Sequence, residues 1–230
     1  MNENLKLRIL HIFFPNKCVS CHKIIKYDLL FCEKCETKLV RTQGKRCKTC
    51  YAPEGLCDCQ QVPKFFFRSV SPFVYEDSVK NSLLSLKTLK NKRLARFFAE
   101  EISELIKKKF KDVRFDAIIP VPLHKDREKE RGYNQSKLLC EELSKKLNAP
   151  VMDKVLQQHD RAKLQHTLDY KLRRKNVKGI YRAGGIPIEC QRVLLVDDIM
   201  TSGSTLNECS KMLRIEGVSK IYCASVARTK

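Results

Sequence analysis

The sequence predicts an α/β domain built on a parallel sheet, preceded by a small domain held together by metal ions. Strands and helices alternate after residue 64, one apolar strand ends in two carboxylates, and eight of the twelve cysteines lie between Cys18 and Cys59. Alternating strands and helices form parallel sheets with helices on both faces. We therefore expect one domain over residues 1–63 and a second over residues 64–230.

Four short cysteine pairs characterise the first domain. Three have the spacing C-x2-C and the last is C-x-C, and such pairs form knuckles that each supply two ligands to a tetrahedral zinc ion. The spacing also allows interleaved pairing, and we interpret His22 as a knuckle spacer. We expect two structural zinc ions, one on Cys18, Cys21, Cys32 and Cys35 and the other on Cys47, Cys50, Cys57 and Cys59.

Four disulfides in a secreted module are the alternative, and they would require an export signal. The N-terminal apolar stretch is broken by Arg8 and His11 and has no small-residue cleavage site before the cysteines. No apolar run approaches the ~20 residues of a membrane-spanning helix. We therefore expect a cytoplasmic protein without a membrane span. Four scattered cysteines are expected in its core, namely Cys140, Cys190, Cys209 and Cys223.

Hydrophobic patterning gives the elements of the second domain, after a connection at residues 60–64. Apolar runs and alternation predict strands, and apolar residues three and four apart predict helices. The roughly 167 residues of this part are enough for one core. The predicted strands are 67–75, 115–122, 193–196 and 220–227, and the predicted helices are 77–90, 94–110, 133–147 and 204–216.

The strand over Val193–Val196 carries the strongest functional signal. Asp197 and Asp198 lie at its carboxyl end, and the loop Thr201–Thr205 offers hydroxyls, backbone N–H groups and a glycine that tolerates positive φ. Such a loop at a helix N-terminus is an anion site. An ordinary strand–helix unit with a capping Asp or Ser explains one acid, but not two adjacent acids before five small residues. The segment is neither a Walker loop nor a dinucleotide fingerprint.

Two further segments are expected at the same site. Residues 120–136 follow a predicted strand, so they reach the same edge of the sheet, where Arg127 and Arg131 suit diphosphate oxygens. Gly132 offers a turn there, and Asn134 and Gln135 are expected to cap the next helix. A charged surface loop is the alternative. Residues 160–181 are polar and basic, which predicts a lid or a helix with a solvated face.

The formal charge is +20, with 11 basic and 6 acidic side chains in residues 1–63 and 35 basic and 20 acidic in the remainder. Both domains are therefore basic. Diphosphate and nucleic acid are the partners that such a charge favours. A lysine-rich solvated surface is the alternative, and it accounts for much of residues 107–111.

Paired cysteines, PVPL…R…RGYNQ, R…Q…L…R…N and VDDIMTSGST follow one another in this order, and together they resemble the ComF family. That family combines a zinc-ribbon head with a type I phosphoribosyltransferase-like domain. The resemblance implies that Asp197 and Asp198 hold the ribose hydroxyls of phosphoribosyl diphosphate. It assigns the 5-phosphate to Thr201, Ser202, Gly203, Ser204 and Thr205, further ligand contacts to Arg127, Arg131 and Lys87, and the lid motif to Arg161, Gln165, Arg173 and Asn176.

Two departures from the family pattern accompany this resemblance. Thr88 stands where an aromatic residue usually follows the lysine, so a stacking role there is not expected. Tyr133 replaces the more common Phe with a similar shape.

The resemblance also implies Mg²⁺ with the ligand and a role in natural transformation, on incoming single-stranded DNA. One hypothesis is a phosphoribosyltransferase whose acceptor and general base the sequence does not identify. The other is a non-catalytic nucleic-acid-binding adaptor or ligand sensor that recruits a DNA helicase or recombination loader. A competence helicase and DNA-processing proteins are the expected protein partners. The DNA surface is left open between the lid and the zinc-ribbon head.

Overall fold

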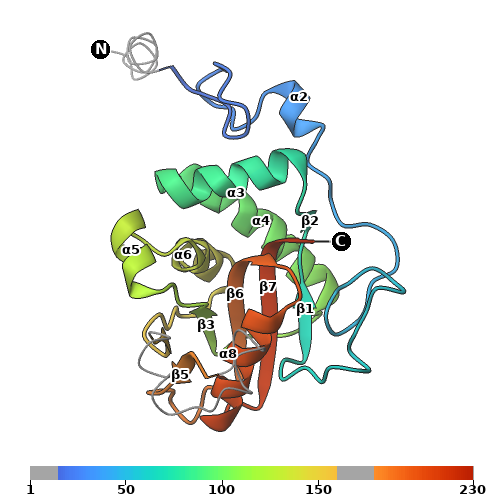
Figure 1. The fold of residues 1–230 in the computed structure, drawn as a ribbon, viewed down its shortest axis with the longest axis vertical. Coiled ribbons are helices and arrows are strands. Elements are labelled where there is room, and N and C mark those ends of the chain that lie inside the picture. The colour runs from blue at the N-terminus through green and yellow to red at the C-terminus, as the bar shows by residue number, and fades with distance from the viewer. Residues whose placement is uncertain (1–14, 160–178, 230) are drawn as a thin grey trace, which may run out of the picture.

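A parallel sheet forms the centre of the molecule (Figure 1). The computed structural model describes residues 15–159 and 179–229. Its strands follow the order β1-β7-β6-β3, and β2 also pairs with β7. All of these pairings are parallel, which confirms the predicted fold class. The strands are β1 (Arg68–Val70), β2 (Phe73–Val74), β3 (Ala117–Pro120), β6 (Arg192–Met200) and β7 (Lys220–Arg228).

The central strand β6 is longer than the apolar pattern predicts. Its residues Val193–Val196 are fully buried, as expected for a strand with both faces covered. The sequence placed Asp197 and Asp198 at the end of this strand, but β6 continues through them to Met200. The cause is β7, whose backbone pairs with β6 as far as Met200 opposite Arg228. The acid pair, as we call Asp197 and Asp198, is therefore held by sheet geometry.

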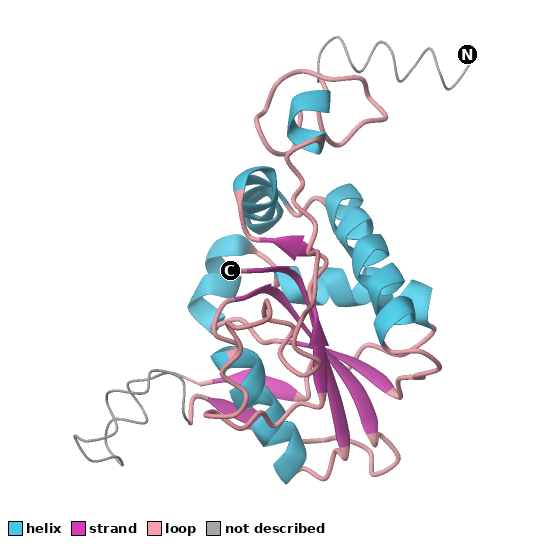
Figure 2. Ribbon diagram, turned by 90° about the vertical axis from the view of Figure 1, so that its right-hand side faces the viewer, coloured by secondary structure: helices cyan, strands magenta, loops and turns pink. Residues whose placement is uncertain are grey.

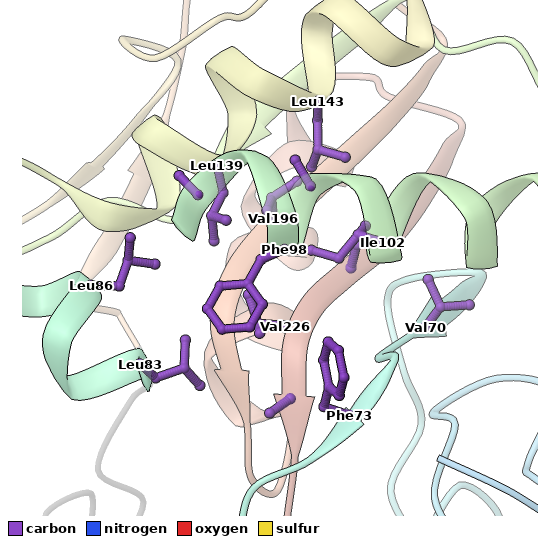
Figure 3. Packing of buried hydrophobic residues seen from close by; sticks show 14 of the residues in the cluster. Val70, Phe73, Leu83, Leu86, Phe98, Ile102, Leu139, Leu143, Val196 and Val226 are labelled. Carbon is purple, nitrogen blue, oxygen red and sulfur yellow. The ribbon is translucent and has the colours of Figure 1, made fainter. Parts of the chain in front are cut away.

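Helices cover both faces of the sheet (Figure 2). On one face, Phe98 and Ile102 of α4 lie beside Val196 of β6 (Figure 3). On the other face, Leu206 of α8 belongs to the same buried cluster as Leu195. Adjacent strand residues thus serve opposite layers, as the period of a strand requires. The first layer consists of α3 (Asp77–Leu89), α4 (Lys92–Lys109) and α6 (Gln135–Leu147), and the second contains α8 (Ser204–Ile215).

A short helix, α5 (Lys125–Arg131), replaces part of the loop predicted between β3 and α6. His124 caps its first turn, two acidic residues follow, and Arg131 lies in its last turn. Gly132 then ends it with a φ of 74°. These are ordinary helix start and stop signals. The remaining elements are α2 (Glu33–Glu36) and an antiparallel pair of β4 (Leu156–Gln158) and β5 (Tyr181–Ala183).

The cysteine-rich part packs directly on the sheet and on α4. Val74 donates its backbone N–H to Val40, so the chain between the cysteine pairs extends the sheet edge at β2. The Phe31 and Phe97 rings lie 5.4 Å apart, edge to face. The Arg228 guanidinium, itself buried, donates to the Cys50 carbonyl over 2.8 Å. The boundary at residue 63 stays a prediction.

The four scattered cysteines, Cys140, Cys190, Cys209 and Cys223, are all buried, which agrees with their predicted place in the core. Across the described ranges, no helix combines the length and the apolar character needed to span a bilayer.

Candidate functional site

The acid pair lies near the carboxyl end of β6, where polar side chains from α3 and α6 meet it. The Ser136 hydroxyl donates to Asp197 Oδ1 over 3.3 Å, and the backbone N–H of Asp198 donates to the same oxygen over 2.8 Å. Gln135 Nε2 donates to Asp198 Oδ2 over 3.2 Å. Asp198 is only 7% exposed, so these donors replace water around it.

Lys87 reaches the same carboxylate from α3. Its Nζ lies 2.9 Å from Asp198 Oδ2. On the far side of Gln135, Arg131 Nη1 donates to Gln135 Oε1 over 3.3 Å. Asp198 is thus joined to Lys87 directly and to Arg131 through Gln135, and the sequence had named these three charged residues separately. Gln135 was predicted to cap α6, which is wrong, because Asn134 caps the helix and Gln135 is its first residue.

Two carboxylates side by side raise the pKa of Asp197. Burial is the main cause and the Asp198 charge is the second, and together they bring the pKa of Asp197 from 3.8 to about 8. The backbone N–H of Asp198 and the charge of Lys87 act in the opposite direction. Among the described residues, Lys87 is the one cation that forms an ion pair with these two carboxylates. A ligand with hydroxyl donors, or a bound cation, would therefore stabilise the ionised form of Asp197.

The loop after β6 opens α8 without a side-chain cap. Its N-cap is Gly203, with a φ of 76° that favours glycine. A methyl group on Gly203 would lie 2.6 Å from Met200 Cε, so the turn is also tight. The hydroxyls of Ser202 and Ser204 lie 2.6 Å apart, and both are exposed. The first turn of α8 therefore presents hydroxyls and N–H groups where the sequence predicts an anion site.

A hollow of about 410 Å³ adjoins this loop. Thr205 lines it from α8 and Arg127 lines it from α5, so two residues predicted from distant segments share one cavity. His124, His159 and Tyr181 also line it. The sequence did not single out these three residues, although His124 and Tyr181 lie within predicted segments and His159 lies next to one. The lid residues Arg161, Gln165, Arg173 and Asn176 lie outside the described residues.

The aromatic residue of the RGYNQ segment has a structural contact. The Tyr133 hydroxyl donates to the Leu86 carbonyl and accepts the backbone N–H of Lys90 over 2.7 Å. These two hydrogen bonds connect the last turn of α3 to the residue just before the N-cap of α6, and Lys87 lies in that last turn. Thr88, which stands where the family has an aromatic residue, is exposed and donates to the Leu84 carbonyl of its own helix.

The structure brings each predicted set of four cysteines together. We call Cys18, Cys21, Cys32 and Cys35 the first cysteine cluster, and Cys47, Cys50, Cys57 and Cys59 the second. Within each cluster all four sulfurs lie within 4.8 Å of one another. Several separations, such as 3.6 Å between Cys21 and Cys32 and 3.7 Å between Cys50 and Cys57, fit a tetrahedron. Zinc–sulfur bonds of ~2.3 Å require sulfurs about 3.8 Å apart.

Both clusters begin with the same knuckle turn. His22 donates its backbone N–H to Cys18, and Tyr51 donates in the same way to Cys47. Both His22 and Tyr51 have positive φ, 62° and 59°. His22 is exposed and outside the sulfur cluster, as expected for a spacer. The first thiol of each knuckle ionises more readily than a free cysteine. Burial raises its pKa, but backbone N–H donors outweigh burial and lower the pKa of Cys18 and of Cys47 to about 7.

Two family models match the chain in the order that the structure shows. A double zinc ribbon domain matches residues 9–62, and a phosphoribosyl transferase domain matches residues 136–230. The fold and the site thus define a phosphoribosyltransferase-type α/β protein with a double zinc ribbon.

Curated relatives narrow this class. Competence protein F of Haemophilus influenzae is 32% identical, over 95% of this chain and 93% of its own. Competence protein ComFC of Bacillus subtilis is 26% identical over 84% of this chain and 82% of its own. DNA utilization protein YhgH of Escherichia coli O157:H7 is 35% identical over half of each chain. The chain belongs to the ComF family of competence proteins.

Proposed function

We propose that this protein binds phosphoribosyl diphosphate with Mg²⁺ at the carboxyl edge of its sheet and acts on incoming single-stranded DNA during natural transformation. The observation that carries the proposal is the acid pair of β6, in which the buried Asp198 meets Lys87 and Gln135 and which is followed by the uncapped start of α8. Ligands of open α/β sheets bind at this edge. The names of the competence relatives support the biological role.

Each group of the ligand finds a suitable partner there. The two ribose hydroxyls would donate to the carboxylates of Asp197 and Asp198, which act purely as hydrogen-bond acceptors when ionised. The 5-phosphate would take the N–H and hydroxyl groups at Thr201–Thr205. The diphosphate would extend toward Arg127 and Arg131, whose planar donors match its oxygens.

Lys87 has a second role in this proposal. Its Nζ forms an ion pair with Asp198 Oδ2, and a ribose hydroxyl would donate a hydrogen bond to the same carboxylate. Binding of the ligand would displace this ammonium group and make it available to a phosphate oxygen nearby. The ion pair would thus keep the buried carboxylate neutralised until the ligand arrives.

Mg²⁺ fits the donor set, because hard cations take oxygen ligands and these would come mainly from the diphosphate and water. When bound, the ion would neutralise charge on the departing diphosphate. In ribosyl transfer the bond between C1 and the diphosphate oxygen breaks and a bond from C1 to the acceptor forms. The acceptor releases its proton to solvent. The protein would position the sugar by Asp197 and Asp198 and stabilise the leaving group by Arg127 and Arg131.

A second candidate function is a non-catalytic adaptor that uses the ligand as a signal and recruits DNA-processing proteins. The direct packing of the cysteine-rich part on the sheet favours it. The buried Arg228 at the end of β7 holds the Cys50 carbonyl, so a change near the acid pair's strand has a physical route to the second cysteine cluster. Both functions need the same ligand.

Calorimetry with phosphoribosyl diphosphate and Mg²⁺ tests the binding site. Asp197→Asn with Asp198→Asn keeps shape and removes charge, so binding should be lost while folding persists. Glu189→Gln with Glu216→Gln removes the same charge from exposed positions and should bind like the unchanged protein. Equal affinity in the acid-pair variant would refute the site.

Turnover is tested with the same proteins. Diphosphate release is measured in the presence of a panel of nucleobases and single-stranded DNA. Release with one acceptor supports the transferase. Tight binding without release from any of them supports the adaptor.

A further inference from the structure

A groove of about 590 Å³ runs between the second cysteine cluster and the end of α4. Residues that are distant in sequence form its walls, since β1 and the last turn of α4 face the knuckle there. Of the described residues that line it, five are cations and one, Glu54, is an acid. We call it the basic groove, and its cations are Lys45, Arg46, Lys48, Arg68 and Lys109.

The cations of the basic groove are not neutralised by carboxylates of the fold. Across residues 15–159 and 179–229, none of the five forms an ion pair with a carboxylate. Lys45, Lys48 and Lys109 are exposed. Arg46 and Arg68 donate only to backbone carbonyls, those of Gln43 and Lys109.

The metal beside the groove does not cancel this charge. A zinc ion with four thiolates carries two negative charges, and Glu54 adds one. The five cations outnumber these three. Lys107 and Lys108 add to the surplus from the same turn of α4. The groove therefore keeps a positive field that suits a polyanion.

An exposed aromatic ring continues the groove toward the amino ends of the strands. Phe67 is 46% exposed, although its neighbour Phe66 is buried in the core. Its ring rests edge-on against Tyr222, with centroids 5.5 Å apart. The Arg68 guanidinium lies 5.5 Å and the Lys220 ammonium 5.8 Å from the ring centroid. Because Arg68 also lines the groove, the ring and the groove form one surface.

We infer that this surface binds a single-stranded nucleic acid, with its phosphates on Lys45, Lys48 and Lys109 and one base stacked on Phe67. A basic channel next to an aromatic ring is the arrangement that binds single strands with little sequence preference, because every base has a stacking face. The flanking cations hold the ring in place and attract the backbone. The inference rests on the proposed action on incoming single strands and adds the place where the strand lies.

The surface is separate from the phosphoribosyl site. Arg68 and Lys220 begin β1 and β7, whereas Asp197 and Asp198 lie toward the carboxyl end of β6 (Figure 1). The nucleic acid and the diphosphate ligand would therefore bind together without competing. The surface lies beside the zinc-ribbon head, which is one of the two locations that the sequence left open.

Fluorescence anisotropy with labelled oligo-dT of about ten nucleotides tests the surface. In the full chain, Lys45→Gln, Lys48→Gln and Lys109→Gln together should weaken binding by about tenfold or more. They should also lower the slope of log K against log salt by about 2, since single strands release ~0.7 counterions for each contact. The matched control is Lys23→Gln, Lys26→Gln and Lys38→Gln, which removes the same charge from exposed positions around the first cysteine cluster and should change little.

The stacking contact is tested by Phe67→Leu, which keeps apolar packing on Tyr222 but removes the aromatic face. Binding should weaken by about fivefold or more, with an unchanged salt slope. Oligo-rU of the same length is compared with oligo-dT to determine whether RNA or DNA binds better. A DNA duplex should bind more weakly than either single strand. Equal binding by the duplex would overturn the stacking contact.

Two failures are distinguishable. If the unchanged protein binds no single strand, the proposed action on DNA is wrong. If it binds normally and the groove triple variant binds equally well, only the surface assigned here is wrong. Calorimetry with phosphoribosyl diphosphate verifies that each variant is folded, because these residues lie outside that site.

Discussion

The carboxyl edge of the sheet and the basic groove both gather cations, but they hold them in different states. At the carboxyl edge, Lys87 contacts Asp198 and Arg131 contacts Gln135. In the groove, Lys45 and Lys109 project without a carboxylate partner among the described residues. A partnered cation in a buried network selects a ligand by geometry. Exposed, unpartnered cations bind a polyanion through charge, and salt weakens that binding.

The structural elements that hold the two regions in place differ as well. The acid pair belongs to a central strand that pairs with neighbours on both sides. The groove depends on the knuckle of Cys47 and Cys50, a segment with little apolar core of its own. Metal removal should therefore unfold the basic groove and hardly change the carboxyl edge of the sheet. The following experiments use this difference.

Zinc removal should give the largest effect and separate the two regions completely. We expect two zinc ions per chain by element analysis, because eight thiolates complete two tetrahedral shells. A strong chelator should unfold residues 18–59 first and abolish single-strand binding, while phosphoribosyl diphosphate still binds. Hydrogen exchange on the chelated protein checks the order of unfolding.

Single cysteine variants sharpen this test. Cys57→Ser removes one exposed thiol of the second cluster and should leave one zinc ion and no functional groove. Cys190→Ser alters a buried cysteine outside both clusters and should keep two zinc ions. A single zinc ion in the unchanged protein, or a groove that still binds DNA after chelation, would disprove the two-site assignment.

The pH dependence of stability should single out the carboxyl edge. Because the folded pKa of Asp197 is raised from 3.8 to about 8, the folded chain binds more protons than the unfolded chain between these values. Its free energy of unfolding should therefore fall as pH rises through this window. Each unit of pKa shift corresponds to ~1.4 kcal/mol of unfolding free energy. We therefore expect this effect to be second in size, after that of zinc removal.

Urea denaturation across that pH range measures the slope. Asp197→Asn removes the titrating group and should flatten the decline, whereas Asp112→Asn, at an exposed position, should leave it unchanged. Identical slopes for the unchanged protein and the Asp197 variant would show that folding does not raise the pKa of Asp197.

Short-range patterns account for what the sequence could predict. The apolar run before Asp197 and the spacing of Cys18 and Cys21 are local signals, and the sheet and both sulfur clusters follow from them. The helix α5 was also predictable, because acidic residues in its first turn and Gly132 at its end are standard helix signals that the interpretation as a charged loop overlooked. These features need no knowledge of tertiary packing.

Contacts between distant segments could not be predicted in this way. Gln135 reaches Asp198 only because α6 packs against β6, and nothing in its neighbourhood distinguishes it from a capping residue. The basic groove joins Lys45 to Lys109, which are far apart in the chain. Phe67 looked like the start of a strand, and only the packed fold shows that its ring faces solvent.

Arg131→Ala should affect one ligand of the carboxyl edge more than another. Its guanidinium is assigned to the diphosphate, so affinity for phosphoribosyl diphosphate should fall by about 10- to 100-fold, the value of a charge-assisted hydrogen bond of ~1.5–3 kcal/mol. Affinity for ribose 5-phosphate should hardly change. Lys129→Ala removes an exposed charge from the same helix and is the control. Calorimetry with both ligands measures these affinities. An equal loss of affinity for both ligands would show that Arg131 contacts the sugar phosphate that they share and not the diphosphate.

Gly203→Ala should have the smallest effect, and it tests the tight turn that presents the anion site. Alanine at a φ of 76° costs about 1 kcal/mol relative to glycine. Its methyl group would also meet Met200 Cε, which is the flexible end of a side chain and can move aside. We expect a loss of about 1 kcal/mol in unfolding free energy and an equal weakening of phosphoribosyl diphosphate and ribose 5-phosphate, because both share the 5-phosphate. Gly184→Ala, where a Cβ meets open space, should change neither quantity. Unequal weakening of the two ligands would place the 5-phosphate elsewhere, and single-strand binding should stay constant throughout, since the basic groove lies at the other end of the strands.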